Sequence, residues 1–227
     1  MKPCDLAHKR ILITQADSFM GPMLCRTFTD LGAKVFTDNR PLLDPELPAQ
    51  IVRAAEPLDV LVANLALAAP FTPAISADDE EWQQVFSHLV DPLPRLVRAA
   101  LPSMIQRGAG KILLMGSAAA LRGMKRASTY SAARGAQLAY IQAVGIELAP
   151  HNIQINAIAQ NFVDNPTYFP TEIQANPAFR ERLKREVPLG RLVSASEDAL
   201  FAAYLCSDAA DCFVGQIFPI SGGWVTR

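Results

Sequence analysis

The chain has 227 residues, of which half are hydrophobic and 19% are charged, and its formal net charge is −1. This balance is ordinary for a globular protein with a full core, and it excludes a bulk electrostatic attraction to nucleic acid or to an anionic membrane. No apolar run reaches the ~20 residues of a membrane span. The first residues carry no signal-peptide core, so a cytoplasmic protein is expected.

Apolar runs of strand length alternate along the chain with longer segments of helical periodicity. Strands are predicted at residues 10–14, 34–38, 58–64, 110–116, 153–158 and 216–220. Helices are predicted at residues 22–31, 48–55, 79–107, 128–148, 172–185 and 197–207. The helix at 79–107 is expected to break or kink near Pro92 and Pro94. Residues 159–170 are too polar and too rich in proline for a regular element.

Fully apolar strands that alternate with helices predict a parallel sheet covered on both faces. The expected fold is one α/β domain over residues 1–227, a Rossmann-like, doubly wound parallel sheet in a three-layer α/β/α arrangement. Such sheets bind ligands at the carboxyl ends of their strands. The segments expected to line the site are therefore residues 14–21, 64–68, 117–123 and 159–170.

The cysteines and histidines give no sign of a metal site or a disulfide. Cys4, Cys25, Cys206 and Cys212 form no C-x-x-C pair, and no histidine stands at a metal-ligand spacing from another ligand. We therefore expect reduced thiols and no bound metal ion.

Three side chains form the candidate catalytic group. Ser117 ends a predicted strand, and Tyr130 and Arg134 are four residues apart, so they share one face of the helix that follows. A tyrosine ionises near pH ~10 when unperturbed, and a permanently charged guanidinium nearby favours the phenolate. The spacing therefore predicts a tyrosine base beside a cation, with Ser117 aiming a substrate oxygen at it.

These residues and several later motifs resemble the short-chain dehydrogenase/reductase superfamily over the whole chain. Ser117 and the Tyr130–Arg134 segment are similar to its Ser and Tyr-x-x-x-Lys pattern. Further segments that match its landmarks are residues 155–158, 188–191, 215–216 and 221–224. The resemblance implies a Rossmann-like fold.

The departures from that superfamily all concern its nicotinamide cofactor or its proton relay. In the segment that replaces the glycine-rich loop, Phe19 takes a glycine position and Asp17 adds a negative charge. The other departures are Ala63–Ala66 for Asn-Asn-Ala-Gly, Leu89 for the relay asparagine, Arg134 for the lysine, and Gln160–Asn161 for Pro-Gly. Together they predict that no cofactor binds.

A Ser-Tyr-Arg set with an aromatic residue in the glycine loop resembles the halohydrin dehalogenases, most closely their shorter B-type branch. The resemblance implies cofactor-independent, reversible conversion of vicinal haloalcohols to epoxides, with release of halide and a proton. It also implies epoxide opening by small anions such as cyanide, azide and nitrite, and a homotetramer. Ser117, Tyr130 and Arg134 would be the catalytic residues. The expected halide and substrate site comprises Phe19, Gln160, Asn161, Phe162, Val163 and Phe169.

Two other functions stay open. The first is an atypical NAD-dependent short-chain dehydrogenase/reductase, which Asp38 favours because it ends the second strand, where an acid that selects NAD would lie. The second is a catalytically inactive scaffold or regulatory protein, which the intact Ser-Tyr-Arg set disfavours.

Overall fold

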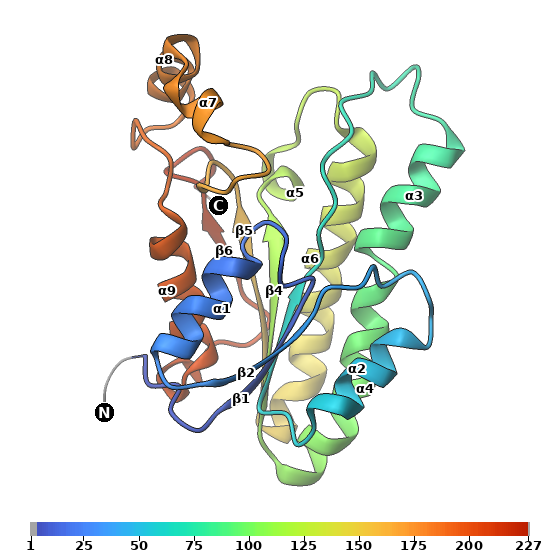
Figure 1. The fold of residues 1–227 in the computed structure, drawn as a ribbon. Coiled ribbons are helices and arrows are strands. Elements are labelled where there is room, and N and C mark those ends of the chain that lie inside the picture. The colour runs from blue at the N-terminus through green and yellow to red at the C-terminus, as the bar shows by residue number, and fades with distance from the viewer. Residues whose placement is uncertain (1–3, 227) are drawn as a thin grey trace.

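The computed structural model describes residues 4–226 and is built on a six-stranded sheet in the order β2-β1-β3-β4-β5-β6 (Figure 1). Each neighbouring pair of strands is parallel. The strands are β1 (Arg10–Thr14), β2 (Lys34–Asp38), β3 (Val60–Asn64), β4 (Gly110–Ser117), β5 (Ile153–Gln160) and β6 (Ile217–Ile220). The predicted α/β class and parallel sheet are confirmed.

Helices cover both faces of this sheet, so the molecule has three layers (Figure 1). One face carries α1 (Gly21–Asp30) and α9 (Ala195–Cys206). The other face carries α2 (Leu47–Ala55), α3 (Asp79–Leu89), α4 (Pro92–Arg107) and α6 (Ser128–Leu148). The short helices α5 (Ala119–Arg122), α7 (Thr171–Ala175) and α8 (Pro177–Glu186) lie at the carboxyl ends of the strands, and the 3-10 turns are η1 (Ala149–His151) and η2 (Asp208–Ala210).

The hydrophobic core is split by the sheet into two clusters, one under each helical layer. All five residues of β3 are buried, as are all but the first residue of β4. A strand covered on both faces needs apolar side chains on both, which is why these strands appear in the sequence as continuous apolar runs. No helix in the described part of the chain is both long enough and apolar enough to cross a membrane.

The structure corrects two of the predicted elements and confirms a predicted break in a third. The strand predicted at 153–158 continues to Gln160, because Gln160 pairs with Ile220 of β6 in parallel register. The helix predicted at 172–185 is two helices, because Asn176 accepts the Ala178 N–H as the N-cap of α8 and Pro177 follows it. The break expected near Pro92 in the helix at 79–107 is present, because α3 ends at Leu89 and α4 begins at Pro92.

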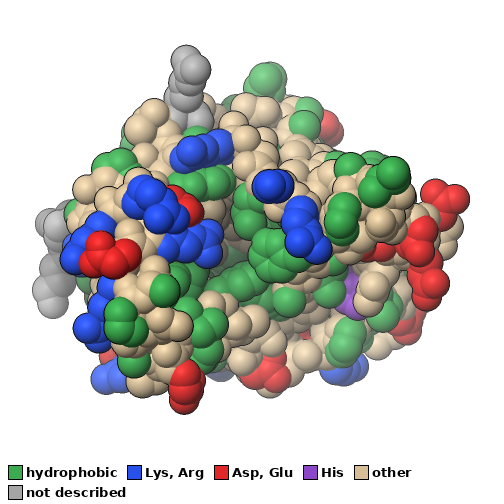
Figure 2. Space-filling view, turned by 90° about the horizontal axis from the view of Figure 1, so that it is seen from above, with side chains coloured by type: hydrophobic (Ala, Val, Ile, Leu, Met, Phe, Trp, Pro, Cys, Tyr) green, Lys and Arg blue, Asp and Glu red, His purple; other side chains and the backbone are tan. Residues whose placement is uncertain are grey.

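The carboxyl ends of the strands open into a hollow beneath α7 and α8. Figure 2 looks down on this end of the molecule and shows hydrophobic side chains inside the hollow, with Lys and Arg side chains around it. A third, small cluster of buried residues closes one side, formed by Phe162, Leu183 and Val187. The hollow lies where a doubly wound sheet is expected to bind its ligand.

Candidate active site

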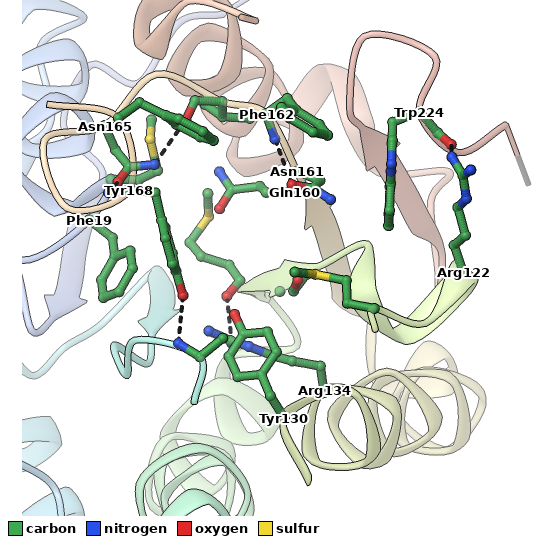
Figure 3. Close-up of a pocket in the computed structure, with 18 of the residues that line it drawn as sticks. Phe19, Arg122, Tyr130, Arg134, Gln160, Asn161, Phe162, Asn165, Tyr168 and Trp224 are labelled. Carbon is green, nitrogen blue, oxygen red and sulfur yellow. Dashed lines mark hydrogen bonds between the residues drawn. The ribbon is translucent and has the colours of Figure 1, made fainter. Parts of the chain in front are cut away.

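The hollow contains a pocket of about 590 Å³ (Figure 3). The structure brings all the predicted site residues to its wall, namely Phe19, Ser117, Tyr130, Arg134, Gln160, Asn161, Phe162, Val163 and Phe169. They come from the segments after β1, β4 and β5 and from the first turns of α6. The topology therefore gathers at one strand edge groups that are up to 150 residues apart in sequence, since Phe19 and Phe169 share the wall.

Ser117 and Tyr130 face the pocket from neighbouring elements. Ser117 is the last residue of β4, and its Oγ accepts a hydrogen bond from the Ala119 N–H at 3.2 Å. Because that oxygen is already an acceptor, its own proton is free to be donated into the pocket. Tyr130 lies in the first turn of α6 and is 5% exposed.

Arg134 lies one helical turn after Tyr130 and is buried beside it, with its Cζ 5.1 Å from the centre of the Tyr130 ring. Its Nη1 donates to the carbonyl oxygen of Met115 at 3.3 Å and to Gln137 Oε1 at 3.0 Å, and its Nη2 donates to the carbonyl oxygen of Leu65 at 3.1 Å. Its Nε has no partner. The guanidinium thus joins the ends of β3 and β4.

No carboxylate neutralises this guanidinium: the salt bridges among residues 4–226 do not include Arg134. A buried charge without a counter-charge is unfavourable, and arginine cannot lose its proton. The pocket therefore favours an anion beside Arg134, either an ionised Tyr130 or a bound ligand.

Phe19 occupies a backbone conformation that suits glycine. Its φ is +50°, in the left-handed region, and its ring packs on Tyr168 with the ring centres 5.3 Å apart. The Asn64 side-chain amide donates to the carbonyl oxygens of Gln15 and Ser18 at 2.9 and 3.0 Å, which fixes the loop. Strain of this kind gathers at functional sites. An aromatic ring therefore stands where a glycine-rich loop would approach a phosphate.

The residues present do not fit a dinucleotide cofactor. The pyrophosphate of such a cofactor needs glycines that leave its path open, and here Phe19 and Tyr168 close that path. The remaining glycine, Gly21, is needed for packing, since a Cβ on it would lie 2.5 Å from the carbonyl oxygen of Ala16. Asp38, the candidate ribose acid, forms a 2.6 Å salt bridge with Arg40.

The segment after β5 was predicted to supply backbone N–H groups to an anion. Two of them already have partners: the Asn161 N–H donates to the carbonyl oxygen of Ile220 at 3.0 Å, and the Phe162 N–H to Asn161 Oδ1 at 2.9 Å. The Val163 N–H has no partner within residues 4–226. Phe162 has a φ of +52°, a second strained aromatic residue at the pocket. The backbone donor that remains for a ligand is therefore Val163.

Gln160 is tied to a buried acid that the sequence did not single out. Its Nε2 donates to Asp198 Oδ2 at 2.6 Å, while Asp198 Oδ1 is buried without a partner. Burial raises the pKa of Asp198 to about 7, although the hydrogen bond from Gln160 acts in the opposite direction. The side chain of Gln160 is thereby held at the pocket wall.

Tyr168 is a site residue that sequence reasoning missed. Its Oη accepts a hydrogen bond from the Ala69 N–H at 2.9 Å, and its ring points toward Tyr130 (Figure 3). Burial raises the pKa of the Tyr168 phenol far above its usual range, and the neighbouring Tyr130 raises it further. The one signal in the sequence was its place beside Phe169 in a segment already assigned to the site.

The opposite end of the pocket carries Trp224 and Arg122, which the sequence also did not assign. Arg122 Nη1 donates to the carbonyl oxygen of Trp224 at 2.6 Å, and its Cζ lies 4.6 Å from the centre of the Trp224 ring (Figure 3). Among the described residues, no group of three His, Cys, Asp or Glu side chains is placed to hold a metal ion.

Comparisons with known sequences relate the chain to oxidoreductases. A family model described as enoyl-(acyl carrier protein) reductase matches residues 45–225. An uncharacterized oxidoreductase, YmfI, of Bacillus subtilis is 32% identical over 200 residues, which are 85% of this chain and 80% of that protein. A galactitol 2-dehydrogenase (L-tagatose-forming) of Cereibacter sphaeroides is 29% identical, over 93% of each chain.

Comparisons with solved structures add a protein of a different kind. A structure named "Dehalogenation enzyme" superposes with a TM-score of 0.91 at 30% identity, over 97% of this chain and 100% of that one. L-sorbose reductase from Gluconobacter frateurii, complexed with NADPH and L-sorbose, has a TM-score of 0.88 at 22% identity, over 98% and 99%. At that identity the likeness to the reductase shows the fold alone.

Proposed function

The chain belongs to the short-chain dehydrogenase/reductase superfamily, and we propose that within it the protein is a halohydrin dehalogenase that works without a nicotinamide cofactor. The superfamily and the Rossmann-like fold expected from the sequence are confirmed. The finer assignment is supported by the site and by the likeness to a dehalogenation enzyme.

The observation that carries the proposal is the Phe19 ring in a glycine conformation. It packs on Tyr168 and closes the path of a dinucleotide, while Ser117, Tyr130 and Arg134 stay together at the pocket wall. A site that keeps its oxygen-handling groups and loses the hydride carrier is suited to proton transfer. It is not suited to oxidation or reduction of the substrate carbon.

In the proposed reaction, the Tyr130 phenolate accepts the proton of the substrate hydroxyl, which Ser117 holds by donating a hydrogen bond. The substrate oxygen forms a bond to the adjacent carbon, and the bond from that carbon to the halogen breaks. The halide leaves with the bonding electron pair, and Tyr130 returns its proton to solvent. In the reverse direction, Tyr130 protonates the opening epoxide while cyanide, azide or nitrite attacks the carbon.

Arg134 supplies the charge that this cycle needs. Its guanidinium is fixed by the carbonyl oxygens of Met115 and Leu65, so it does not have to reorganise when the phenolate forms. The absence of a carboxylate partner within the described residues leaves its field directed at Tyr130. Arg134 therefore favours the ionised base.

The leaving halide would bind at the segment after β5. The Val163 N–H and the Asn161 Nδ2 are donors without partners among the described residues, and Phe162 and Phe169 keep the place dry. The Arg182 Cζ lies 5.6 Å from the centre of the Phe162 ring, and its Nε is paired with Glu186 at 3.0 Å. Few donors in an apolar setting favour a large, weakly hydrated anion.

An atypical NAD-dependent oxidoreductase is the alternative, because the sequence relatives described above are oxidoreductases. Asp38 ends β2 where a ribose acid would lie, but it is paired with Arg40. The Phe19–Tyr168 contact opposes this alternative, since both rings would have to separate for a cofactor to enter.

The test is a halide-release assay with 1,3-dichloro-2-propanol and no added NAD(P)H. We expect release by the wild-type protein and a loss of about 100-fold or more in Tyr130→Phe, because a general base contributes that much. Tyr204→Phe is the matched control, since it removes a phenol that donates to Ala209 on the far side of the sheet. No halide from a panel of halohydrins, together with micromolar NADH binding by calorimetry, would favour the oxidoreductase.

The homotetramer and the cytoplasmic location stay predictions. An interface through α4 and α6 would cover Ile105 and Ile146, which are 40% and 77% exposed on those helices.

A further inference from the structure

Tyr168 brings a second phenol to the Tyr130 hydroxyl, and no step of the proposed reaction uses it. Tyr130 and Tyr168 both line the pocket, and their hydroxyl groups are close enough to interact electrostatically. Figure 3 shows the Tyr168 side chain reaching down toward Tyr130 from the wall opposite α6. Tyr130 is the proposed base, so the question is what the second phenol, that of Tyr168, does beside it.

Three contacts fix Tyr168 in this place. Its backbone N–H donates to Asn165 Oδ1 at 2.9 Å, and the same Asn165 side chain donates from Nδ2 to the carbonyl oxygen of Val163 at 2.9 Å. Its ring lies against Phe19, and its Oη accepts the Ala69 N–H at 2.9 Å. The hydroxyl is therefore held in position before any substrate arrives.

These contacts decide which of the two phenols can donate a hydrogen bond to the other. The Tyr168 Oη is already an acceptor for Ala69, so its own proton is left for the Tyr130 oxygen. Arg134 directs three of its five N–H groups at Met115, Gln137 and Leu65, and its Cζ lies 5.1 Å from the centre of the Tyr130 ring. Tyr168 is thus a second side chain placed to donate to a Tyr130 phenolate, from the side opposite α6.

Burial also favours the neutral, protonated form of Tyr168. Burial raises the pKa of Tyr168, the nearby Tyr130 raises it further, and Ala69 and Arg134 only partly oppose this. The other charged side chains that line the pocket are Arg122, Lys125, Arg182 and Glu186, and Asp198 lies behind Gln160. Tyr168 therefore keeps its proton and remains a hydrogen-bond donor.

We propose that Tyr168 is a positioning residue of the active centre, whose hydroxyl donates a hydrogen bond to the Tyr130 oxygen and so stabilises the phenolate. The inference rests on the proposed role of Tyr130 as the base. A phenolate oxygen accepts more than one hydrogen bond, so the substrate hydroxyl approaches Tyr130 while Tyr168 stays bonded. Because Tyr168 and Val163 belong to the same segment, the proposed halide loop and the base are held by one piece of chain.

The experiment compares Tyr168→Phe with the control Tyr204→Phe. Tyrosinate absorbance is titrated without substrate, and the Tyr130 contribution is identified by subtracting Tyr130→Phe. We expect Tyr168→Phe to raise the pH at which Tyr130 ionises by about one unit, since a hydrogen bond to a charged group is lost. The acid limb of the pH profile for halide release should move by the same amount.

Two results would overturn the inference: an unmoved Tyr130 titration in a folded Tyr168→Phe protein, or the same shift in Tyr204→Phe. Equal far-ultraviolet circular dichroism and equal melting temperatures check the fold. A purely structural role would lower the melting temperature and leave the titration unmoved. If the titration shifts but the wild-type protein releases no halide, the proposed function fails and the pairing of the two phenols stands.

Discussion

Arg134 and Asp198 are buried ionisable side chains on opposite sides of the sheet, and they differ in the hydrogen bonds that compensate for their burial. Arg134, on the α6 side, is 5% exposed and bonds to the carbonyl oxygens of Met115 and Leu65. Asp198, on the α9 side, is fully buried and has one bond, from Gln160, with its other oxygen unpartnered. Neither has an oppositely charged partner within the described residues.

This difference indicates which of the two side chains can take part in the reaction. Asp198 can escape the penalty of burial by keeping its proton, and burial raises its pKa to about 7 accordingly. Arg134 has no such escape, because a guanidinium stays charged at any working pH. Its charge is therefore available to an anion in the pocket, whereas Asp198 becomes neutral as pH falls below about 7.

The largest expected effect comes from Arg134→Met. It removes the cation beside Tyr130 and the hydrogen bonds that Arg134 donates to the Met115 and Leu65 carbonyl groups. We expect halide release to fall by about 100-fold or more, and the free energy of unfolding to fall by about 3 kcal/mol. Arg98→Met, at an exposed arginine of α4, is the control and should change neither. Full activity in Arg134→Met would show that Arg134 stabilises the fold and does not act on Tyr130.

Asp198→Asn should change the free energy of unfolding in the opposite direction, by an amount that depends on pH, and it does not touch the Tyr130 base. The unfolded state releases this proton near pH 4 and the folded state only near pH 7, so wild-type stability is lost as pH rises through that window. Asparagine avoids the loss, because Gln160 can turn its amide to pair with it. We expect a gain that grows from pH 4 to pH 7 and reaches at most about 4 kcal/mol.

Urea unfolding at pH 5 and pH 8 measures this gain. Asp30→Asn, at an exposed carboxylate on α1, should show no such pH dependence. If Asp198→Asn is instead less stable by the same amount at both pH values, Asp198 is ionised in the fold. The contrast with Arg134 would then be wrong.

Phe19→Gly should change stability least and still affect function. Relief of the left-handed backbone, worth about 1–2 kcal/mol, offsets the lost packing on Tyr168. We therefore expect the melting temperature to stay within a few degrees while halide release falls by about tenfold or more, as water enters the pocket. The control is His8→Gly, which relieves a similar φ of +69° at an exposed site far from the pocket. Unchanged activity in Phe19→Gly would remove Phe19 from the site.

How well each site residue could be predicted depended on how local its signal was. Tyr130 and Arg134 were found because an i, i+4 spacing on a helix face is visible in the sequence. Tyr168 was missed because its segment has no period, and its position depends on Asn165 and on Phe19, which is 149 residues away. The bond between Gln160 and Asp198 spans 38 residues and likewise left no trace.

The sequence by itself determined the parallel sheet, the order of its elements and the loss of the glycine-rich loop. Those features follow from local patterns. A strand buried on both faces must be apolar, and a phenylalanine ring fills the space that a glycine of the loop would leave open. Only the tertiary structure decided which N–H groups remain free after β5 and that Tyr168 reaches Tyr130. The reason is physical: hydrogen bonds between distant segments depend on how the layers pack, which no local pattern records.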